Sequence, residues 1–452
     1  MLHAQHPGGV LHRLRLVTIV IQQTKHFKGI ILVTIGKRIG AVARDPKSGY
    51  FAFEYDSGFA KRGIELAPLQ MPLKEAGHVF LFPNLPDATY QRLPAMLADA
   101  LPDKFGNALI DAWMAQHGVT KASITTLDRL AYMGERAMGA LTFKPARGPR
   151  KAKSAAVELE GLVRQARLAV EGGFDDEAST SAVLQQIIQV GTSAGGARAK
   201  ATIAWNRDTK EVRSGQFDIP EGHEAWLLKF DGVGVDAQLG PGKSYGRIEY
   251  AYHLMARAAG VDMEECALLE EGGRAHFMTH RFDRDGNTRH HVQSLCAMAH
   301  LDFNQIGTHS YNQLFSTIVD LDLGRDALTQ TLRRMVFNVL ACNCDDHTKN
   351  FAFLLKEDGA WSLAPAYDIT HAFNPENQWI CQHLMAVNGK FSDITLRDVR
   401  EVADRFGVLG ECADVVDQVQ GATADWAKHA KKADLDPSEA DRIAKDLACT
   451  SF

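Results

Sequence analysis

Hydrophobic residues recur at helical spacing immediately before the most polar short stretch of the chain. The spacing of three and four predicts a helix whose apolar face carries Leu328, Leu332, Met335, Val336, Val339 and Leu340. A polar octet, Asn343-Cys-Asp-Asp-His-Thr-Lys-Asn350, follows directly. Two apolar runs, Phe351–Leu355 and Trp361–Ala364, then flank an Asp358-Gly359 turn and predict a hairpin. The pattern therefore predicts a helix that ends in a polar loop, and a hairpin that leads to a further carboxylate in Ala366-Tyr-Asp368.

Alternating and helical patterns also organise the first part of the chain. Residues 1–27 show little periodicity and are interpreted as an extension of unknown role. The predicted elements that follow are a hairpin from Ile30–Ile35 and Arg38–Val42 around Gly36, a strand with Phe51, Phe53 and Tyr55, helices within 89–117 (interrupted by Pro102) and 122–142, and an exposed basic connector, Lys144–Lys153.

The middle of the chain combines helices, a glycine-rich loop and several strands. The predictions are helices over 155–170 and 181–190, a loop Gly191–Lys200, strands 201–205, 211–217 and 226–230, a helix 248–259 with Glu249 in its first turn, and strands 276–282 and 290–293 around Asp285-Gly286. Apart from the hairpin after the octet, the remainder reads as almost wholly helical.

Composition narrows the class of protein without naming a function. The 452 residues predict two to three domains, and 45% hydrophobic with 23% charged residues is ordinary for a globular protein. A net charge of −5 without a basic stripe argues against nucleic acid as the main partner. All seven cysteines lie at or after Cys266 with irregular spacing, which favours reduced thiols. No apolar run of membrane-spanning length and no signal-peptide pattern is present, so we expect a cytoplasmic protein.

The spacing of acids and amides in the octet suits phosphoryl transfer. This chemistry needs a carboxylate that accepts a hydroxyl proton, and oxygen ligands for the magnesium that bridges the phosphates. In the protein-kinase pattern a catalytic Asp precedes a metal-binding Asn by five positions, as Asp345 precedes Asn350. In the same pattern a second metal-binding Asp follows after a pair of strands, and Asp368 occupies that position. Any one of these residues alone would fit a solvated loop, but the ordered set favours a phosphotransferase.

Two further features suit a bound nucleotide. Gly195 and Gly196, with Ser193, form a loop whose backbone N–H groups can approach an anion closely, although an ordinary helix-to-strand turn has the same composition. Lys229 interrupts an apolar strand, where an unpaired ammonium is costly to bury. Nucleotide phosphates and Glu249 on the following helix would pair it. The alternative is an edge-strand lysine that faces water.

Two competing motifs are weaker. Gly240-Pro-Gly-Lys-Ser244 matches the end of a Walker A loop, but position 237, where the first glycine belongs, is Ala237. Cys342, Cys344 and His347 could be zinc ligands, but a structural zinc site takes four ligands and no fourth is evident. The histidines between His276 and His291 are better explained as strand and surface residues.

These motifs, taken in order, resemble the HipA serine/threonine kinases, the toxin halves of HipBA-type bacterial toxin–antitoxin pairs. The resemblance covers roughly residues 30–410. It rests on Ser193-Ala-Gly-Gly-Ala-Arg-Ala-Lys200, Trp226-Leu-Leu-Lys-Phe230, Arg281-Phe-Asp-Arg284, the octet and Ala366-Tyr-Asp368, with Leu101–Gly106 and Met133–Leu141 in the N-terminal part. It implies an α+β fold, a distorted protein kinase with a mixed α/β N-terminal part and an all-helical C-terminal lobe. The implied division is 28–153 as the HipA N-terminal subdomain, 154–288 as an α/β region with the Gly-rich loop, and 289–452 as the catalytic lobe.

The resemblance also implies residue roles and partners. Asp345 would be the catalytic base, Asn350 and Asp368 would hold Mg²⁺, and Lys229 would contact the phosphates of ATP. Ser193 would be autophosphorylated, which switches such enzymes off, since a phosphate cannot stay in a loop built to face phosphates. Supporting roles fall to His347 and Lys349 at the loop or phosphate, and to Glu249 as ion-pair partner.

The implied function is an ATP- and Mg-dependent protein kinase that arrests growth. The implied partners are a HipB-like helix-turn-helix antitoxin, which would itself bind operator DNA, and an aminoacyl-tRNA synthetase as substrate, typically that for glutamate. Three rivals remain: a nucleotide-binding pseudokinase that acts as a corepressor, a zinc hydrolase, and a small-molecule or lipid kinase. The octet departs from the family in two places. Cys344 stands where Thr is usual, and Asp346 stands where a basic residue is common, so a second carboxylate lies beside the base.

Overall fold

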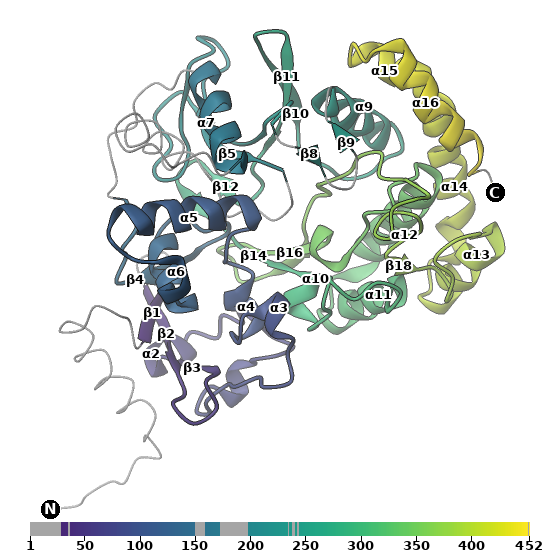
Figure 1. Ribbon diagram of the computed structural model, residues 1–452. Helices are drawn as coiled ribbons and strands as arrows, with labels where there is room; N and C mark the ends of the chain where they lie inside the picture. Colours follow the sequence, from purple (N-terminus) through teal and green to yellow (C-terminus); the bar gives the residue numbers. More distant parts are fainter. Residues whose placement is uncertain are drawn as a thin grey trace, which may run out of the picture.

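Two sheets and a helical lobe follow one another along the chain (Figure 1). The computed structural model describes residues 29–34, 37–149, 159–171, 198–233, 235–236, 240–241, 244–450 and 452. In Figure 1 the first sheet lies at the lower left, the second above it, and the last helices form the right-hand edge.

The N-terminal part is a four-stranded antiparallel sheet with short helices around it. Its strands lie in the order β3-β2-β1-β4, so the last strand, which comes almost 100 residues later, covers the free edge of the first hairpin. The elements are β1 (Gly29–Thr34), β2 (Lys37–Arg44), β3 (Phe51–Tyr55), α2 (Ser57–Ala60), η1 (Leu73–Glu75), α3 (Asp87–Tyr90), α4 (Ala95–Ala98), α5 (Lys104–Gln116), η2 (Lys121–Ser123), α6 (Thr126–Met133) and β4 (Leu141–Lys144).

A five-stranded antiparallel sheet, ordered β10-β11-β7-β5-β6, forms the middle of the chain. Its central strand β7 carries Lys229, and the helix α9 packs against β10 and β11. The elements are α7 (Leu159–Glu171), β5 (Lys200–Trp205), β6 (Val212–Ser214), β7 (Glu224–Lys229), β8 (Val235–Asp236), β9 (Gly240–Pro241), α9 (Tyr245–Ala258), β10 (Cys266–Glu271), β11 (Arg274–His280), β12 (Arg284–Asp285) and β13 (Thr288–Arg289).

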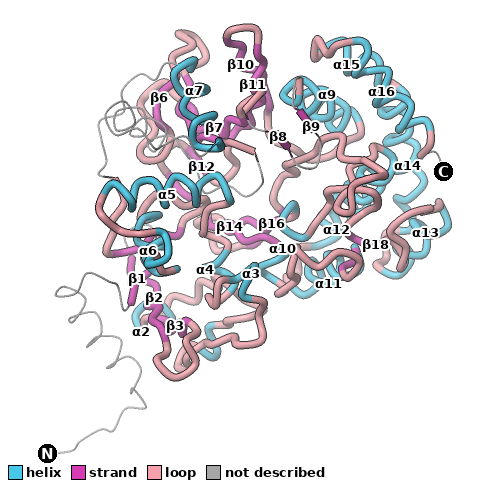
Figure 2. The backbone as a smooth tube through the Cα atoms, in the orientation of Figure 1, coloured by secondary structure: helices cyan, strands magenta, loops and turns pink. Residues whose placement is uncertain are grey.

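The C-terminal lobe is mainly helical and contains a three-stranded sheet, ordered β14-β16-β17, and a two-stranded parallel sheet, β15-β18 (Figure 2). The long helix α12 leads into the polar octet, as its apolar spacing predicts. The elements are β14 (His291–Ser294), α10 (Leu295–Met298), β15 (His309–Ser310), α11 (Tyr311–Asp320), α12 (Gly324–Leu340), η3 (Thr348–Asn350), β16 (Ala352–Leu355), β17 (Trp361–Leu363), β18 (Met385–Ala386), α13 (Leu396–Arg405), α14 (Leu409–Ala424), α15 (Trp426–Lys432) and α16 (Pro437–Ala448).

Two large buried clusters meet between these parts. One joins the N-terminal sheet and its helices to β5 and β7, and includes Leu228 and Phe230 on either side of Lys229. The other joins α9 to the helices of the C-terminal lobe, and includes Ile248 beside Glu249. Lys229 and Glu249 therefore adjoin different hydrophobic cores through their sequence neighbours, and a contact between them lies at the seam between the cores.

Several predicted elements are confirmed, and others need correction. The first hairpin, the strand 51–55, the strand pair around Asn206–Lys210, the strand with Lys229 and the hairpin after the octet all form. The predicted helix 122–142 is wrong, because α6 ends at Gly134 (φ 49°) and the chain then enters β4. Thr125 and Asp128 cap the start of this shorter helix.

The remaining corrections concern where helices begin and end and which sheet a strand joins. The pattern within 89–117 forms three separate helices, because Pro94 stands at the start of α4 and Pro102 precedes α5. The predicted strands near His276 and His290 both form, but in different sheets: β11 joins the five-stranded sheet and β14 pairs with β16. For this reason the catalytic lobe is not all-helical. Glu249 lies one turn into α9 rather than in its first turn.

Some predictions fall outside the described residues. These are the extension 1–27, the helix 181–190, the end of the connector, and the glycine-rich loop with Ser193, Gly195 and Gly196. In the Walker-like stretch, Gly240 and Pro241 form β9 and Ser244 precedes α9, while residues 242–243 are not described.

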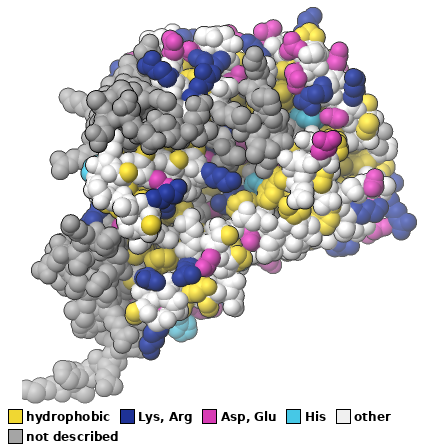
Figure 3. Space-filling view, in the orientation of Figure 1, with side chains coloured by type: hydrophobic (Ala, Val, Ile, Leu, Met, Phe, Trp, Pro, Cys, Tyr) yellow, Lys and Arg dark blue, Asp and Glu magenta, His cyan; other side chains and the backbone are white. Residues whose placement is uncertain are grey.

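The face of the molecule in Figure 3 shows positive and negative side chains interspersed among the described residues. No basic stripe is visible there, in keeping with the low net charge. Within the described ranges, none of the helices has both the length and the apolar character needed to cross a bilayer.

Candidate active site

A buried lysine joins the two cores through a pair of ion pairs. Lys229, with 8% of its side chain exposed, donates to Glu249 of α9 and to Asp368, which follows the hairpin β16–β17. Glu249 is 1% exposed, and Arg198 lies 3.5 Å from its second oxygen. The strand lysine is therefore paired internally, as one of its two predicted explanations requires, and does not face water.

The charges of this triad depend on one another. Burial alone would lower the pKa of Lys229, but the carboxylates of Asp368 and Glu249 outweigh burial and raise it. Burial would likewise raise the pKa of Asp368, but Lys229 and, beyond it, Lys200 lower it. Asp368 adopts the left-handed region with φ 55°, which is uncommon outside glycine. Its carboxylate thus stays ionised in a position where oxygen ligands are needed.

The polar octet forms a tight loop around Asp345. The amide Nδ2 of Asn350 donates to the backbone oxygen of Asp345 at 2.8 Å, which leaves the side-chain oxygen of Asn350 available. The backbone N–H of Lys349 donates to Nδ1 of His347 at 3.2 Å. The proton of His347 therefore resides on Nε2, which lies 3.7 Å from Oδ1 of Asp345. The loop therefore orients the carboxylate of Asp345 and leaves it able to accept a proton.

Asp345 receives a hydrogen bond that sequence reasoning missed. The indole Nε1 of Trp379 donates to its Oδ1 at 2.6 Å, from the segment between Asp368 and β18. The ring of Trp379 also stands edge-on to His347 and to Phe303. Burial raises the pKa of Asp345, whereas His347 and the Trp379 N–H lower it. A tryptophan 34 residues downstream has no spacing that would connect it with the loop in the sequence alone.

Replacing Trp379 by phenylalanine keeps the ring but removes the donor to Asp345. Without that donor the pKa of Asp345 rises further, so the base is protonated over more of the acidic range. We expect the acid limb of the pH profile of kcat/KM to shift upward by about 0.5–1 pH unit. A shift in the other direction, or an unchanged profile, would show that the indole does not act on the base.

Asp346 raises the pKa of Asp345, as a second carboxylate beside the base is expected to do, and it also has a structural position. Its carboxylate is fully buried and accepts hydrogen bonds from Tyr311 Oη at 2.8 Å, His383 Nδ1 at 3.0 Å and the backbone N–H of Leu384 at 2.7 Å. Among the causes of the raised pKa of Asp345, its contribution follows those of burial and Asp368. Asp346 thus connects the octet to the segment that precedes β18. That segment is also the end of the loop that carries Trp379.

The Asp346–His383 pair gives the fold a predictable pH dependence. Burial would lower the pKa of His383, but Asp346 outweighs it and raises the pKa well above the ordinary value. A histidine whose pKa rises on folding contributes stability that is fully present below about pH 6.5 and is lost as the pH rises through the folded-state pKa. We expect His383→Gln to lower the free energy of unfolding by about 3 kcal/mol at pH 6, and by progressively less at higher pH. Urea unfolding between pH 6 and 9 measures this, and a cost that stays constant with pH would contradict it.

The remaining members of the octet line the same site. The ammonium of Lys349 lies 4.9 Å from the ring centre of Phe303, and its backbone oxygen accepts from Tyr367 Oη at 2.6 Å. A small cavity beside the loop is lined by Asn343, Asp346, Asn350 and Asp368 among others. Asn350 and Asp368 therefore line the same cavity, and their side chains carry amide and carboxylate oxygens, the hard donors that Mg²⁺ prefers.

The zinc alternative finds no support in the donor geometry. Cys342 and Cys344 are both buried, and burial raises the pKa of the Cys342 thiol to about 12. Cys344 contacts His383 at 4.0 Å rather than His347. Across the ranges that the structure describes, no three His, Cys, Asp or Glu side chains are arranged to hold a metal ion.

The class of protein follows from the fold and these groups together. A sheet lysine paired with a helix glutamate, a loop Asp five positions before an Asn, and an Asp after a strand pair are the parts of a kinase-type phosphotransferase. They meet at the seam between a sheet-rich part and a mainly helical lobe, where such enzymes bind nucleotide.

Comparison with known proteins places the chain within that class. Residues 192–448 match the model of the HipA-like C-terminal domain, and residues 31–144 match that of the HipA N-terminal domain. The chain therefore belongs to the HipA family of kinases.

Two relatives show how far the likeness reaches. The solved complex of HipA, HipB and operator DNA from the Shewanella oneidensis MR-1 toxin–antitoxin system contains a chain that superposes with a TM-score of 0.65. The match covers 93% of this chain and 95% of that one, at 18% identity, and shows a common fold. The candidate kinase Y4dM of Sinorhizobium fredii (strain NBRC 101917 / NGR234) is 24% identical over 164 residues, which span 32% of this chain and 37% of that protein.

Proposed function

We propose that the chain is an ATP- and Mg-dependent protein serine/threonine kinase that acts as the toxin of a toxin–antitoxin pair. The observation that carries the proposal is the placement of Lys229, Glu249 and Asp368 in one buried ion-paired cluster beside the loop of Asp345. A purely structural salt bridge would need only one carboxylate beside Lys229. It would require neither the second carboxylate, Asp368, nor the side-chain oxygen of Asn350 in the neighbouring loop.

Each residue has a distinct part in the proposed reaction. Asp345 orients the substrate hydroxyl and accepts its proton, with Trp379 and His347 fixing the carboxylate. Lys229 binds phosphate oxygens of ATP and is positioned by Glu249. Asn350 and Asp368 would hold Mg²⁺, which neutralises charge on the phosphates when it is bound. Asp368 is paired with Lys229 in this structure, so its carboxylate is already held beside the group that binds phosphate.

The glycine-rich loop completes the proposed nucleotide site. The backbone N–H groups of this loop, including those of Gly195 and Gly196, would bind the phosphates of ATP. His347 and Lys349 of the octet would support the phosphates from the other side of the site. Autophosphorylation at Ser193 would add charge to this loop and inhibit the enzyme. Support for this comes from the family, whose C-terminal model begins at residue 192 and so includes the loop.

The proposed biological setting follows the family. We infer a HipB-like helix-turn-helix antitoxin as partner, with DNA bound through that antitoxin, and an aminoacyl-tRNA synthetase as substrate in the cytoplasm. The Shewanella oneidensis complex contains HipA together with HipB and operator DNA. The proposed division of the chain is an extension 1–27, an N-terminal subdomain 28–153, an α/β region 154–288 and a catalytic lobe 289–452.

Two rival functions differ at the same site. A pseudokinase that binds nucleotide as a corepressor would retain Lys229 and lack a working base, whereas Asp345 is ionisable and oriented here. A kinase for small molecules or lipids would use the same groups on another hydroxyl. The presence of both HipA domains favours the protein kinase.

Growth and substrate assays test the proposal directly. Induced expression of the chain is expected to arrest growth, and Asp345→Asn is expected to relieve the arrest while the protein accumulates equally. Purified chain with ATP and Mg²⁺ is expected to add phosphate to glutamyl-tRNA synthetase, measured by intact mass. Autophosphorylation without growth arrest would retain the kinase and remove the toxin role. Nucleotide binding without transfer to any protein would favour the pseudokinase.

A further inference from the structure

A second cavity lies between the HipA N-terminal domain and the β12–β13 hairpin, apart from the proposed nucleotide site. Its volume is about 200 Å³. The lining residues come from three segments: Glu135, Thr142 and Lys144; Gln216, Phe217 and Asp218; and Arg284, Gly286, Asn287 and Arg289. None of these residues belongs to the octet, and neither Lys229 nor Asp368 reaches the cavity.

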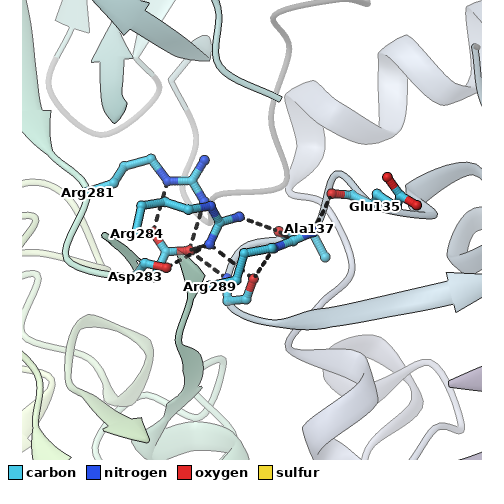
Figure 4. A network of polar contacts seen from close by, with 7 residues as sticks. Glu135, Ala137, Arg281, Asp283, Arg284 and Arg289 are labelled. Carbon is cyan, nitrogen blue, oxygen red and sulfur yellow. Dashed lines mark hydrogen bonds and ion pairs between the residues drawn. The ribbon is translucent and has the colours of Figure 1, made fainter. Parts of the chain in front are cut away.

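The wall of this cavity is part of an arginine cluster with one carboxylate (Figure 4). Asp283 accepts from Arg281 at 2.7 Å, from Arg284 at 2.7 Å and from the backbone N–H of Gly139 at 2.7 Å. The side chains of Arg281, Asp283 and Arg284 are 3%, 1% and 6% exposed. Two guanidinium groups therefore share one buried carboxylate.

Among the residues that the structure describes, the third guanidinium donates only to neutral groups. Arg289 donates to the backbone oxygens of Gly139, Glu135 and Ala137 at 3.1, 2.9 and 2.8 Å. Figure 4 shows the side-chain carboxylate of Glu135 pointing away from these arginines. Carbonyl dipoles satisfy the hydrogen bonds of Arg289, while the carboxylates of Asp283 and Glu135 offset its charge only in part, because burial and Arg281 outweigh them.

The surplus charge is costly in this environment. Burial, helped by the neighbouring Arg281, lowers the pKa of Arg284 to about 8, and burial with Arg281 lowers that of Arg289 to about 10. The three carbonyls at the domain junction match the N–H donors of Arg289, but a carbonyl oxygen carries no full negative charge to balance the guanidinium. A negatively charged ligand in the adjoining cavity would compensate the two unbalanced charges.

We propose that this cavity binds the phosphate group of a small molecule, with Arg284 and Arg289 at its inner wall and Lys144 at its rim. A phosphate carries about two negative charges at neutral pH and matches the planar fork of guanidinium groups. Asp218 and Glu135 also line the cavity, and acidic residues at its border suit hydroxyl groups of the same ligand. The ligand class is therefore a hydroxyl-bearing phosphate ester such as a nucleoside or sugar monophosphate.

Occupation of this site would couple the two domains. Gly139, Glu135 and Ala137 belong to the N-terminal domain, whereas Arg284 and Arg289 belong to the hairpin next to the kinase sheet. A bound phosphate would draw the arginines toward the cavity while they still hold these carbonyls. The site thus offers a route by which a metabolite adjusts the position of one domain on the other.

Isothermal titration of the full chain at fixed ionic strength tests the site. The probes are inorganic phosphate, AMP and ribose 5-phosphate, with ribose and chloride as references. The variants are Lys144→Glu, which reverses an exposed rim charge, and Arg289→Gln, which removes an inner one. Lys74→Glu is the matched control, an exposed lysine of the same domain outside the cavity. Circular dichroism confirms that each variant is folded, and Lys144→Glu provides the test if Arg289→Gln is not.

We expect all three phosphate-bearing probes to bind, the two esters more tightly than inorganic phosphate. Both cavity variants are expected to bind at least about tenfold more weakly, and Lys74→Glu as the parent does. Tighter binding of the esters supports a metabolite, and equal binding of all three narrows the ligand to phosphate itself. The proposal is overturned if no probe binds better than chloride, or if binding is the same in the parent and in every folded cavity variant, because the phosphate would then sit elsewhere.

Discussion

Replacing Asp345 by asparagine is expected to lower kcat for phosphoryl transfer by about 10²-fold or more. The amide keeps the size of the side chain and can still accept from Trp379, so the loop keeps its shape. It can no longer accept the proton of a substrate hydroxyl. Steady-state kinetics with ATP and Mg²⁺ measure the effect, and the affinity for ATP should change little because Asp345 is not assigned to the nucleotide.

The neighbouring residue supplies a matched control with the opposite result. Asp346→Asn places an amide where Tyr311, His383 and a backbone N–H all donate, so it is expected to cost about 3 kcal/mol or more of stability. Asp345→Asn should leave the urea midpoint almost unchanged. If Asp345→Asn retained activity, or lost stability as Asp346→Asn does, the assignment of the base would be wrong.

Replacing Lys229 by methionine is expected to remove activity and to destabilise the fold at once. The substitution leaves two carboxylates, Glu249 and Asp368, at a seam without their shared cation. Loss of one partner from a buried ion pair typically costs about 3–5 kcal/mol. Loss of the phosphate contact adds a fall in kcat/KM of about 10²-fold or more, because the charge that meets the phosphates is gone.

Two measurements separate these effects. Urea unfolding gives the stability, and ATP titration under conditions where the variant is fully folded gives the affinity. Lys356→Met is the matched control, since Lys356 is an exposed lysine at the end of β16, away from the triad. A Lys229→Met variant that binds ATP as well as the parent would contradict the phosphate contact. A variant as stable as the parent would contradict the double ion pair.

The parts of the site that sequence could predict are those set by local spacing. The apolar stripe of α12, the octet and the following hairpin are contiguous, so periodicity alone places Asp345, Asn350 and Asp368 in order. Lys229 was identifiable because a charge within an apolar strand needs a partner, and Glu249 on the next helix is that partner. The pairing with Asp368 and the shared seam could not be derived, because they depend on how two separate cores dock.

The elements that sequence reasoning got wrong depend on long-range pairing. The helical pattern of 122–142 continues past Gly134, yet the unpaired edge of β1 recruits residues 141–144 as β4. The strands near His276 and His290 were predicted correctly, but only tertiary packing assigns them to different sheets. Trp379 and the arginine cluster also join segments far apart in the sequence, so no local spacing reveals them.

The central claim is that the groups around Asp345 transfer phosphate from ATP. The most direct test incubates the dephosphorylated chain with ATP and Mg²⁺ and records its intact mass beside Asp345→Asn. The account predicts a gain of one phosphate in the parent alone, located at Ser193. No gain in either protein would contradict autophosphorylation and favour a pseudokinase or a substrate other than protein. An equal gain in both would contradict the assignment of Asp345 as the base.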